Sequence, residues 1–250
     1  MRKGEQTKRE ILQIAEKLFC SRGFRNTGVQ DILDSLHISK GSFYHHFESK
    51  DSVLEALCVQ RADKQAEAAT EALRQPQDPL LRVNAVLACM SPLQESEADF
   101  LAMLLPQMFT SEGRSVMIAY FEAVKRAFLP VMTRELKSAA EADAICTPTT
   151  DAIPDLVMTV AERCAYRMLT LLLRAALQHR HLEPAVMLDG LRTYRAVMER
   201  LLDAPLGSIE LVPVDGWYHA SEKILQRIIL PDAGTLDLPV FDEHELQSSR

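Results

Sequence analysis

The segment of residues 38–53, ISKGSFYHHFESKDSV, constrains the fold more than any other stretch of the chain. It places a glycine, three aromatic rings, two histidines and two lysines close together, a mixture that suits neither a buried helix nor a solvated one. Ser39 is a natural N-cap, so the pattern predicts a very short helix over residues 40–46. Phe43 and Phe47 are four residues apart and share one face, which we expect to be buried.

Two further helices are predicted upstream of this segment. Thr7 begins the first, with Glu10 completing a capping box, and Gly23 ends it at a position that favours positive φ. The second covers residues 29–36 and is followed by a tight break at residues 37–39. Three short helices with a tight turn between the second and third are typical of a helix-turn-helix, whose third helix enters the major groove of DNA.

The composition of the third predicted helix fits contact with DNA. Gly41 lets the backbone approach a base closely, because it has no side chain. Lys40 can reach guanine acceptors or a phosphate, and Tyr44 and His46 can donate to phosphate oxygens. Lys50 adds a positive charge at the start of the next helix, where an anion is favoured. These residues indicate a DNA-reading surface.

The same region resembles a known family. The string GFRNTGVQDILDSLHISKGSFYHHFESKDSVLEAL, residues 23–57, is similar to the DNA-binding region of the TetR family of bacterial regulators. The similarity covers residues 7–57, about a fifth of the chain. Two positions depart from the family pattern. His37 takes the turn without the freedom of glycine, and Gly28 stands where a Ser or Thr often caps the second helix.

The resemblance implies a homodimeric, ligand-responsive transcriptional repressor that binds a palindromic double-stranded DNA operator and a small-molecule effector of unknown identity. It implies no cofactor. Gln30 and Lys40 would be the readers of sequence. The residues that fall where family members contact DNA are Thr27, Gln30, Ser39, Lys40, Gly41, Tyr44, His45, His46 and Lys50.

The charge distribution supports a local site for a polyanion. The net charge is −7, but the first 50 residues carry nine basic and six acidic side chains. A basic end on an acidic body favours one nucleic-acid site over general coating. The five cysteines form no C-x-x-C pair, which argues against disulfides and a zinc site. No run is long enough to span a membrane, so we expect a cytoplasmic protein with no membrane partner. The family resemblance implies that the protein is bacterial and nucleoid-associated when bound to DNA.

The remaining pattern predicts an all-α protein. After a long helix over residues 50–74, we expect five more at residues 79–90, 97–109, 111–138, 154–180 and 184–203. Beyond Pro205, a short extended piece and an amphipathic helix are expected at residues 209–214 and 217–230, before a loose acidic end. The predicted parts are a helix-turn-helix domain, a larger helical-bundle ligand-binding and dimerisation domain, and a C-terminal extension, at residues 1–50, 51–204 and 205–250.

Methionines and aromatic residues recur along the middle helices. Such side chains line adaptable apolar pockets but also fill ordinary cores. Taken with the family resemblance, they give a predicted pocket lined by Phe100, Met103, Leu104, Met108, Met117, Tyr120, Phe121, Phe128, Cys164 and Met168.

The last two long helices of the predicted bundle are apolar over a wide arc. That width favours a helix-bundle dimer interface, with burial inside one chain as the alternative. The predicted interface residues are Leu156, Val160, Leu171, Leu172, Ala175, Leu191, Tyr194, Met198 and Leu201.

Metal sites and enzymatic activity are not expected. His45 and His46 are adjacent and point apart on a helix, and the basic residues 178–183 suit the end of a helix. Common catalytic motifs are absent. The alternatives left open are a same-fold activator or constitutive DNA binder, an enzyme on the body that depends on His179 or His181, and a helical adaptor that has lost DNA binding.

Overall fold

The structure, a computed structural model, describes residues 3–74, 78–147, 152–181, 184–212, 214–230 and Leu236. Within these ranges the chain forms helices and one isolated bridge between Thr110 and Leu236, with no named strand. The elements are α1 (Lys3–Arg22), α2 (Val29–Leu36), α3 (Lys40–Tyr44), α4 (Lys50–Ala72), α5 (Pro79–Met90), η1 (Glu95–Glu97), α6 (Ala98–Met108), α7 (Arg114–Glu141), α8 (Ala152–Leu177), α9 (Pro184–Leu202) and α10 (Val214–Arg227).

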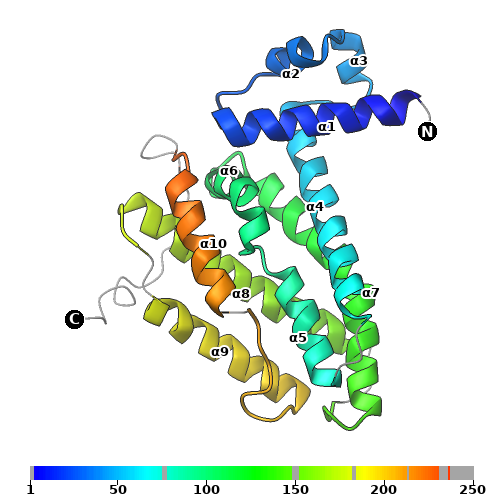
Figure 1. The fold of residues 1–250 in the computed structure, drawn as a ribbon, viewed down its shortest axis with the longest axis vertical. Helices are drawn as coiled ribbons and strands as arrows, with labels where there is room; N and C mark the ends of the chain where they lie inside the picture. Colours follow the sequence, from blue (N-terminus) through cyan, green and yellow to red (C-terminus); the bar gives the residue numbers. More distant parts are fainter. Residues whose placement is uncertain are drawn as a thin grey trace.

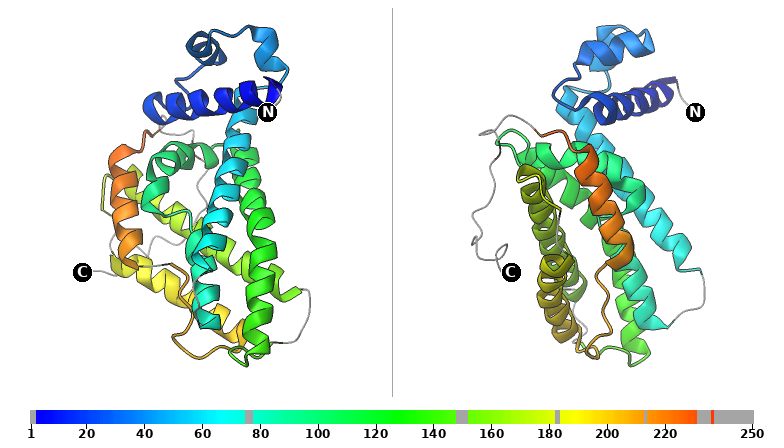
Figure 2. Two further views of the ribbon diagram at one scale, coloured as in Figure 1. Left: turned by 45° about the vertical axis from the view of Figure 1, so that its right-hand side comes forward. Right: turned by 60° about the vertical axis from the view of Figure 1, so that its left-hand side comes forward.

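The helices form a small head on a larger body (Figure 1). We call residues 3–49, with α1, α2 and α3, the head, and α4 to α9 the body. Helix α4 leads out of the head and packs along α7, and α5 packs on both. Helix α8 packs on α7 and α9, while α10 lies against α6 and η1 (Figure 2). The prediction of an all-α protein is confirmed, and the domain boundaries at residues 50 and 204 stay predictions.

The head is held together by aromatic side chains. Phe19 and Phe24 meet edge to face with ring centroids 5.0 Å apart. Phe43 and Phe47 are buried, as their spacing predicts. Burying such rings stabilises a small domain by about 2 kcal/mol each. Gly23 ends α1 with φ of 87°, which confirms the predicted stop.

The predicted start of the first helix is wrong. Helix α1 begins at Lys3, four residues before Thr7. The Glu10 carboxylate accepts a hydrogen bond from Gln6 Nε2 at 2.6 Å inside the helix, so it does not cap the start. Glu5 in the first turn favours the longer helix, because a carboxylate near the N-terminus is stabilised by the positive end of the helix dipole.

The turn between α2 and α3 is tight and contains no glycine. His37 has φ of 52° and ψ of 40°, and its N–H donates to the Leu33 carbonyl. Histidine is among the residues that tolerate this left-handed conformation. Gly28 caps α2 without a side chain, and its own N–H donates to the Asp31 carboxylate at 2.7 Å. Neither the glycine cap at the start of α2 nor the histidine in the turn after it disrupts the helix or the turn.

The helices of the body follow the predicted order, with shifted ends. Helix α7 starts at Arg114 because a turn occupies residues 110–113. That turn needs glycine, since a Cβ on Gly113 would collide with the Gln107 carbonyl. Residues 148–151, between α7 and α8, lie outside the described residues.

The C-terminal segment, residues 203–230, packs back on the body. Glu199 Oε1 accepts hydrogen bonds from Arg195 Nε at 3.0 Å, Gly207 N at 2.8 Å and Ile209 N at 3.3 Å. Asn84 of α5 holds the next residues through the Ser208 carbonyl at 2.8 Å. Of the short extended piece predicted at residues 209–214, residues 209–212 form no named strand, residue 213 lies outside the described residues, and Val214 already belongs to α10.

The amphipathic helix predicted after that piece is present as α10, three residues earlier than expected. Its apolar face includes Trp217 and Ile224, which are buried against the body. The acidic end predicted to be loose lies outside the described residues, apart from Leu236.

Arg61 of α4 joins the head to the body. Its guanidinium pairs with Glu16 of α1 and with Glu97 of η1. The same group lies 4.4 Å from the centroid of the Phe100 ring in α6, in a cation–π contact. One side chain thus fixes α1, α4, η1 and α6 relative to each other.

Replacing Arg61 by Leu is expected to lower the free energy of unfolding by about 2 kcal/mol, because two half-buried carboxylates lose their partner. Urea denaturation at pH 7 measures the change. Lys64→Leu, at an exposed position of the same helix, is the matched control and should change stability by less than about 0.5 kcal/mol. An equal loss of unfolding free energy in the two variants would show that the ion pairs of Arg61 add nothing to stability.

A pH dependence is expected at Glu199. Burial raises the pKa of this carboxyl, but hydrogen bonds from Arg195 and from the backbone N–H groups of Ile209 and Gly207 lower it overall. A depressed pKa stabilises the fold above the unfolded value of about 4.3, and that stability is lost as the pH falls below it. Glu199→Gln should therefore cost about 1–2 kcal/mol at pH 7 and progressively less below pH ~4.

Urea denaturation from pH 7 to pH 3 tests this dependence. Glu67→Gln, at an exposed position of α4, serves as the control. A Glu199→Gln deficit that is unchanged at pH 3 would contradict the assigned role of the charge.

Candidate nucleic-acid interface and interior cavity

Helix α3 presents a polar face to solvent above a buried apolar one. Phe43 is buried beneath the helix, and Tyr44 stands beside it with 54% of its surface exposed and the two rings 5.4 Å apart. Ser39 caps the helix by accepting a hydrogen bond from Ser42 N at 3.2 Å. Lys40 is exposed at its first position. The cap and the buried ring therefore fix which side chains face outward.

Gly41 lies in the middle of this outward face. Its φ is not positive, and a Cβ placed there would meet only the Ser39 Oγ, at 3.9 Å. The fold itself therefore does not require glycine at this position. The missing side chain leaves a flat surface through which an external partner can reach the helix backbone.

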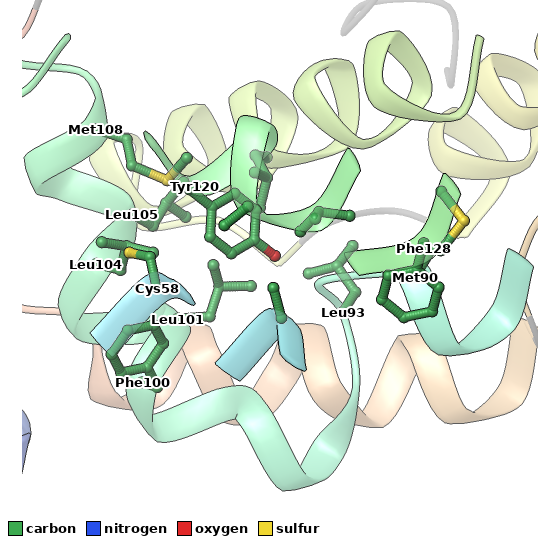
Figure 3. Packing of buried hydrophobic residues seen from close by; sticks show 14 of the residues in the cluster. Cys58, Met90, Leu93, Phe100, Leu101, Leu104, Leu105, Met108, Tyr120 and Phe128 are labelled. Carbon is green, nitrogen blue, oxygen red and sulfur yellow. The ribbon is translucent and has the colours of Figure 1, made fainter. Parts of the chain in front are cut away.

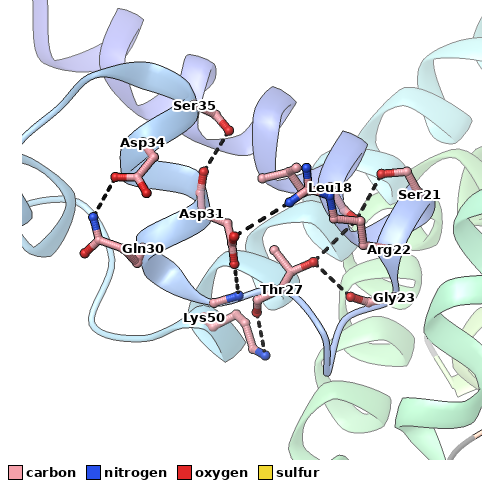
Figure 4. Close-up of polar contacts among 11 residues, drawn as sticks. Leu18, Ser21, Arg22, Gly23, Thr27, Gln30, Asp31, Asp34, Ser35 and Lys50 are labelled. Carbon is pink, nitrogen blue, oxygen red and sulfur yellow. Dashed lines mark hydrogen bonds and ion pairs between the residues drawn. The ribbon is translucent and has the colours of Figure 1, made fainter.

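Thr27 does not belong to the exposed set. Its side chain has 0% exposure, and its hydroxyl donates to the Gly23 carbonyl at 2.9 Å (Figure 4). A second, longer bond runs to the Leu18 carbonyl at 3.4 Å. The predicted DNA contact of this side chain is corrected, because the hydroxyl is used to fix the loop between α1 and α2.

Lys50 is half-buried, and two of the three N–H groups of its ammonium already donate hydrogen bonds. Its ammonium donates to the carbonyls of Phe24 at 2.7 Å and Thr27 at 2.9 Å (Figure 4). It also lies 4.2 Å from the centroid of the Phe24 ring. Burial lowers the pKa of this amine, as does the nearby charge of Arg25, while Asp51 raises it. Lys50 fixes the start of α4 to the head and retains one further N–H.

The remaining predicted residues lie at or near the outward face. Gln30 of α2 is exposed, and its amide nitrogen donates to Asp34 at 2.7 Å, which leaves the amide oxygen to accept. His45 and His46 follow α3 with ring centroids 5.0 Å apart. Burial lowers the pKa of His46, and the charges of His45 and Lys8 act in the same direction.

Lys8 of α1 is a cation near this face that the sequence analysis missed. Its ammonium lies 5.6 Å from the centroid of the Phe47 ring. The net positive charge of the first 50 residues was a signal for it, but the motif did not include it.

A cavity of about 40 Å³ lies in the body, between α5, α7, α8 and the side chains of Leu211, Val212 and Trp217. Of the predicted pocket residues, Tyr120, Phe121, Cys164 and Met168 line it. Met90 of α5 also lines it, and neither Met90 nor the three side chains beyond α9 were among the predicted lining residues. An apolar cluster beyond Pro205 was visible in the sequence, but its place was not.

The other predicted pocket residues do not line this cavity. Helix α6 packs against α1, α7 and α10, so its apolar side chains fill the core (Figure 3). Phe128 is buried farther along α7, and Met117 is only partly buried. The core residues concerned are Phe100, Met103, Leu104, Met108 and Phe128.

Most of the predicted dimer stripe is buried within one chain, because α8 and α9 pack on each other. Leu156 is 44% exposed, and Val197 on the apolar stripe of α9 is 45% exposed. Val160, Tyr194 and Leu201 are half-buried at the edge of the helix pair. The residues of the stripe already buried in the chain are Leu171, Leu172, Ala175, Leu191 and Met198.

The described residues hold no group of three or more His, Cys, Asp or Glu side chains placed to bind a metal ion. His181 Nδ1 lies 3.1 Å from the Glu222 carboxylate of α10. Leu182 and Glu183 of the predicted basic cluster lie outside the described residues. None of the described helices is long and apolar enough to cross a membrane.

The N-terminal region of the chain resembles known proteins in sequence. Residues 11–57 match the sequence model described as "Bacterial regulatory proteins, tetR family". Over 48 residues the chain is 50% identical to the HTH-type transcriptional repressor KstR2 of Rhodococcus jostii, covering 19% of this chain and 24% of that protein. Over 60 residues it is 33% identical to the HTH-type transcriptional regulator UidR of Escherichia coli, covering 24% and 31%. The match thus spans less than a third of these relatives.

Solved structures extend the likeness over the body. A TetR-family transcriptional regulator from Pectobacterium atrosepticum superposes with a TM-score of 0.60 at 19% identity, covering 82% of this chain and 99% of that one. RolR in complex with resorcinol gives a TM-score of 0.53 at 18% identity, covering 92% and 97%. At such identity the likeness concerns the fold alone. Residues 11–57 therefore match the TetR family of bacterial regulatory proteins in sequence, and the chain as a whole shares the fold of a TetR-family regulator of known structure.

Proposed function

We propose that the chain is a DNA-binding transcriptional regulator, acting as a homodimeric repressor on a palindromic operator under the control of a small-molecule effector. The observation that carries the proposal is the outward face of α3. It has an exposed Lys40 and Tyr44 on either side of Gly41, a glycine that the fold itself does not need. A protein of this kind works in the cytoplasm, where bacterial DNA lies.

The chemistry of this face matches the two parts of DNA recognition. Lysine and tyrosine donors bind phosphate oxygens and set the register, while base edges are read by side chains close to the groove floor. The flat surface at Gly41 lets α3 enter the major groove closely, with Lys40 placed for guanine acceptors. Lys8 of α1 and the remaining N–H of Lys50 supply further positive charge at the rim.

The proposed dimer is supported by side chains left exposed on α8 and α9. Leu156 and Val197 project from the two helices, although most neighbouring apolar residues are buried. Two heads related by a two-fold axis would read the two halves of a palindrome. The described part of the chain gives no other use for these two side chains.

The proposed effector site is the cavity between α5, α7 and α8. A concave, mainly apolar space with a few polar groups is the usual form of a small-molecule site. The solved RolR structure, similar in fold, holds resorcinol. The repressor role is supported by the name of the KstR2 relative, which shares the head alone. No observation favours an enzyme or an adaptor.

Selection of bound duplexes from a random pool should recover a palindromic sequence. Gly41→Ala is then expected to weaken binding to that duplex about tenfold or more, because the new methyl group stands between α3 and the bases. The free protein should be no less stable, since alanine favours a helix and the position is open. Fluorescence anisotropy and thermal denaturation measure the two effects.

Gly216→Ala is the matched control, since that position in α10 also has open space around a Cβ. Its affinity for the selected duplex should equal that of the wild type. Recovery of no duplex by the folded wild type would overturn the proposed function, and unchanged affinity in Gly41→Ala would overturn the role of α3.

The dimer can be broken at its proposed surface. Replacing Leu156 and Val197 together by Glu should convert a dimer into a monomer in sedimentation velocity, because four charges would meet across the two-fold axis. Leu81→Glu, at a position of α5 that is 57% exposed, should leave the dimer intact. A wild type that is monomeric at micromolar concentration, or a double variant that stays dimeric, would contradict the interface.

A further inference from the structure

Helix α10 touches both functional regions of the molecule. Trp217 in its first turn lines the cavity together with Leu211 and Val212. From Trp217 to Arg227, ten residues later, the helix extends about 15 Å. At that far end, Arg227 and two residues that follow the helix, Ile229 and Leu230, lie next to the head. The views of Figure 2 show α10 running along the body toward the head.

The far end of α10 meets the loop that begins the helix-turn-helix. A Cβ placed on Gly23 would be 3.7 Å from Ile229 Cδ1, an ordinary van der Waals contact. A crevice of about 180 Å³ at this junction is lined by Phe24 of the head, Met103 of α6, and Arg227, Ile229 and Leu230. Arg227 pairs with Asp99 at the start of α6, which fixes the end of α10 to the body.

The cavity is too small for an effector as it stands. A volume of about 40 Å³ accepts roughly three water molecules. A larger occupant must displace one of the walls. The walls from α5, α7 and α8 belong to helices that pack on each other, whereas α10 rests mainly on α6 and η1. The wall formed by Leu211, Val212 and Trp217 is therefore the one expected to be displaced, and its displacement would move α10.

Two hydrogen-bond donors belong to the lining, and one of them has no partner among the described residues. The Trp217 indole N–H is buried and unpaired. The Tyr120 side chain, which carries a hydroxyl, lines the same cavity and is 5% exposed. Burial raises the pKa of this hydroxyl, so it stays protonated and able to donate. Two donors in an apolar space match an occupant that carries an oxygen acceptor.

The charged residues of the lining argue against an ionic occupant. Lys125 is already paired with Asp155 at 2.6 Å. Glu162 is half-buried, and burial raises the pKa of its carboxyl, which disfavours its own charge. The rest of the lining is mainly apolar, and moving an unpaired ion into such a space is costly.

We propose that the cavity binds a small, uncharged, mainly apolar molecule with an oxygen acceptor, and that α10 carries this binding event from Trp217 to the head through Ile229. The inference rests on the proposed function, because it assigns the ligand chemistry and the route of regulation to the same cavity. A competing route runs through α4, which also joins head and body.

The first test uses Trp217 as its own probe, since the chain has one tryptophan. Benzyl alcohol should change its emission saturably, with a dissociation constant on the order of 1 mM for so small a ligand. Toluene lacks the acceptor and should bind about tenfold more weakly. Tyr120→Phe should remove most of that preference, because it deletes the hydroxyl alone.

Charged analogues of the same size complete the test. Benzoate and benzylamine should produce no saturable change. Tighter binding of either ion, or no binding of benzyl alcohol, would overturn the assigned ligand class.

The second test follows the head directly and needs no operator, so it is independent of the proposed DNA binding. Saturating benzyl alcohol should alter amide hydrogen exchange in residues 19–27 of the wild type. Ile229→Ala should bind benzyl alcohol equally well and lose at least half of that alteration. Leu81→Ala, at an exposed position of α5, should keep it. An unchanged response in Ile229→Ala would assign the coupling to α4 and overturn the role of α10.

Discussion

The guanidinium of Arg61 holds together the parts of the molecule that must act as one. It pairs with Glu16 of the head and Glu97 of η1, and it lies over the Phe100 ring of α6. Without it, the head would be attached to the body through the start of α4 and through the packing of α1 on α4 and α6. Because the charges are only partly exposed, their pairing orients the head on the body. A DNA-reading face needs this, since it must be presented at a fixed angle.

Within the head, most interactions position the outward face of α3. The Ser39 cap starts the helix, Phe43 and Phe47 bury its underside, and Lys50 ties the next helix to the preceding loop. The buried Thr27 hydroxyl helps to position this face by fixing the loop between α1 and α2. The residues free to meet DNA are those that the fold does not use, and Gly41 is the clearest case because the chain gains nothing from its missing side chain.

Much of the head could be predicted because its signals are local. A serine cap, a glycine stop and two phenylalanines four residues apart act through neighbours in sequence. Their predicted roles at Ser39, Gly23, Phe43 and Phe47 are confirmed. The DNA contact assigned to Thr27 is corrected because a sequence motif does not show which way a hydroxyl points. The start of α1 was missed because Gln6 and Glu10 bond inside the helix.

The body was predicted less well because its sites depend on which helices meet. Met108 and Met168 look alike in sequence, but Met108, the last residue of α6, fills the core, whereas Met168 lines the cavity. The stripe on α8 was read as a dimer surface, although α9 of the same chain covers most of it. Trp217 and its neighbours were recognised as apolar, but their position beside α5, α7 and α8 follows from the folded chain alone.

We propose that the outward face of α3 binds the phosphates and bases of DNA. The most direct measurement is the affinity of the wild-type chain for its selected duplex as a function of salt concentration. Each phosphate contact releases counterions, so we expect a steep, linear fall of log affinity with log salt, on the order of a thousandfold between 50 and 200 mM. An affinity that does not change with salt would contradict this proposal, because it would mean that the basic face of the head does not meet the DNA backbone.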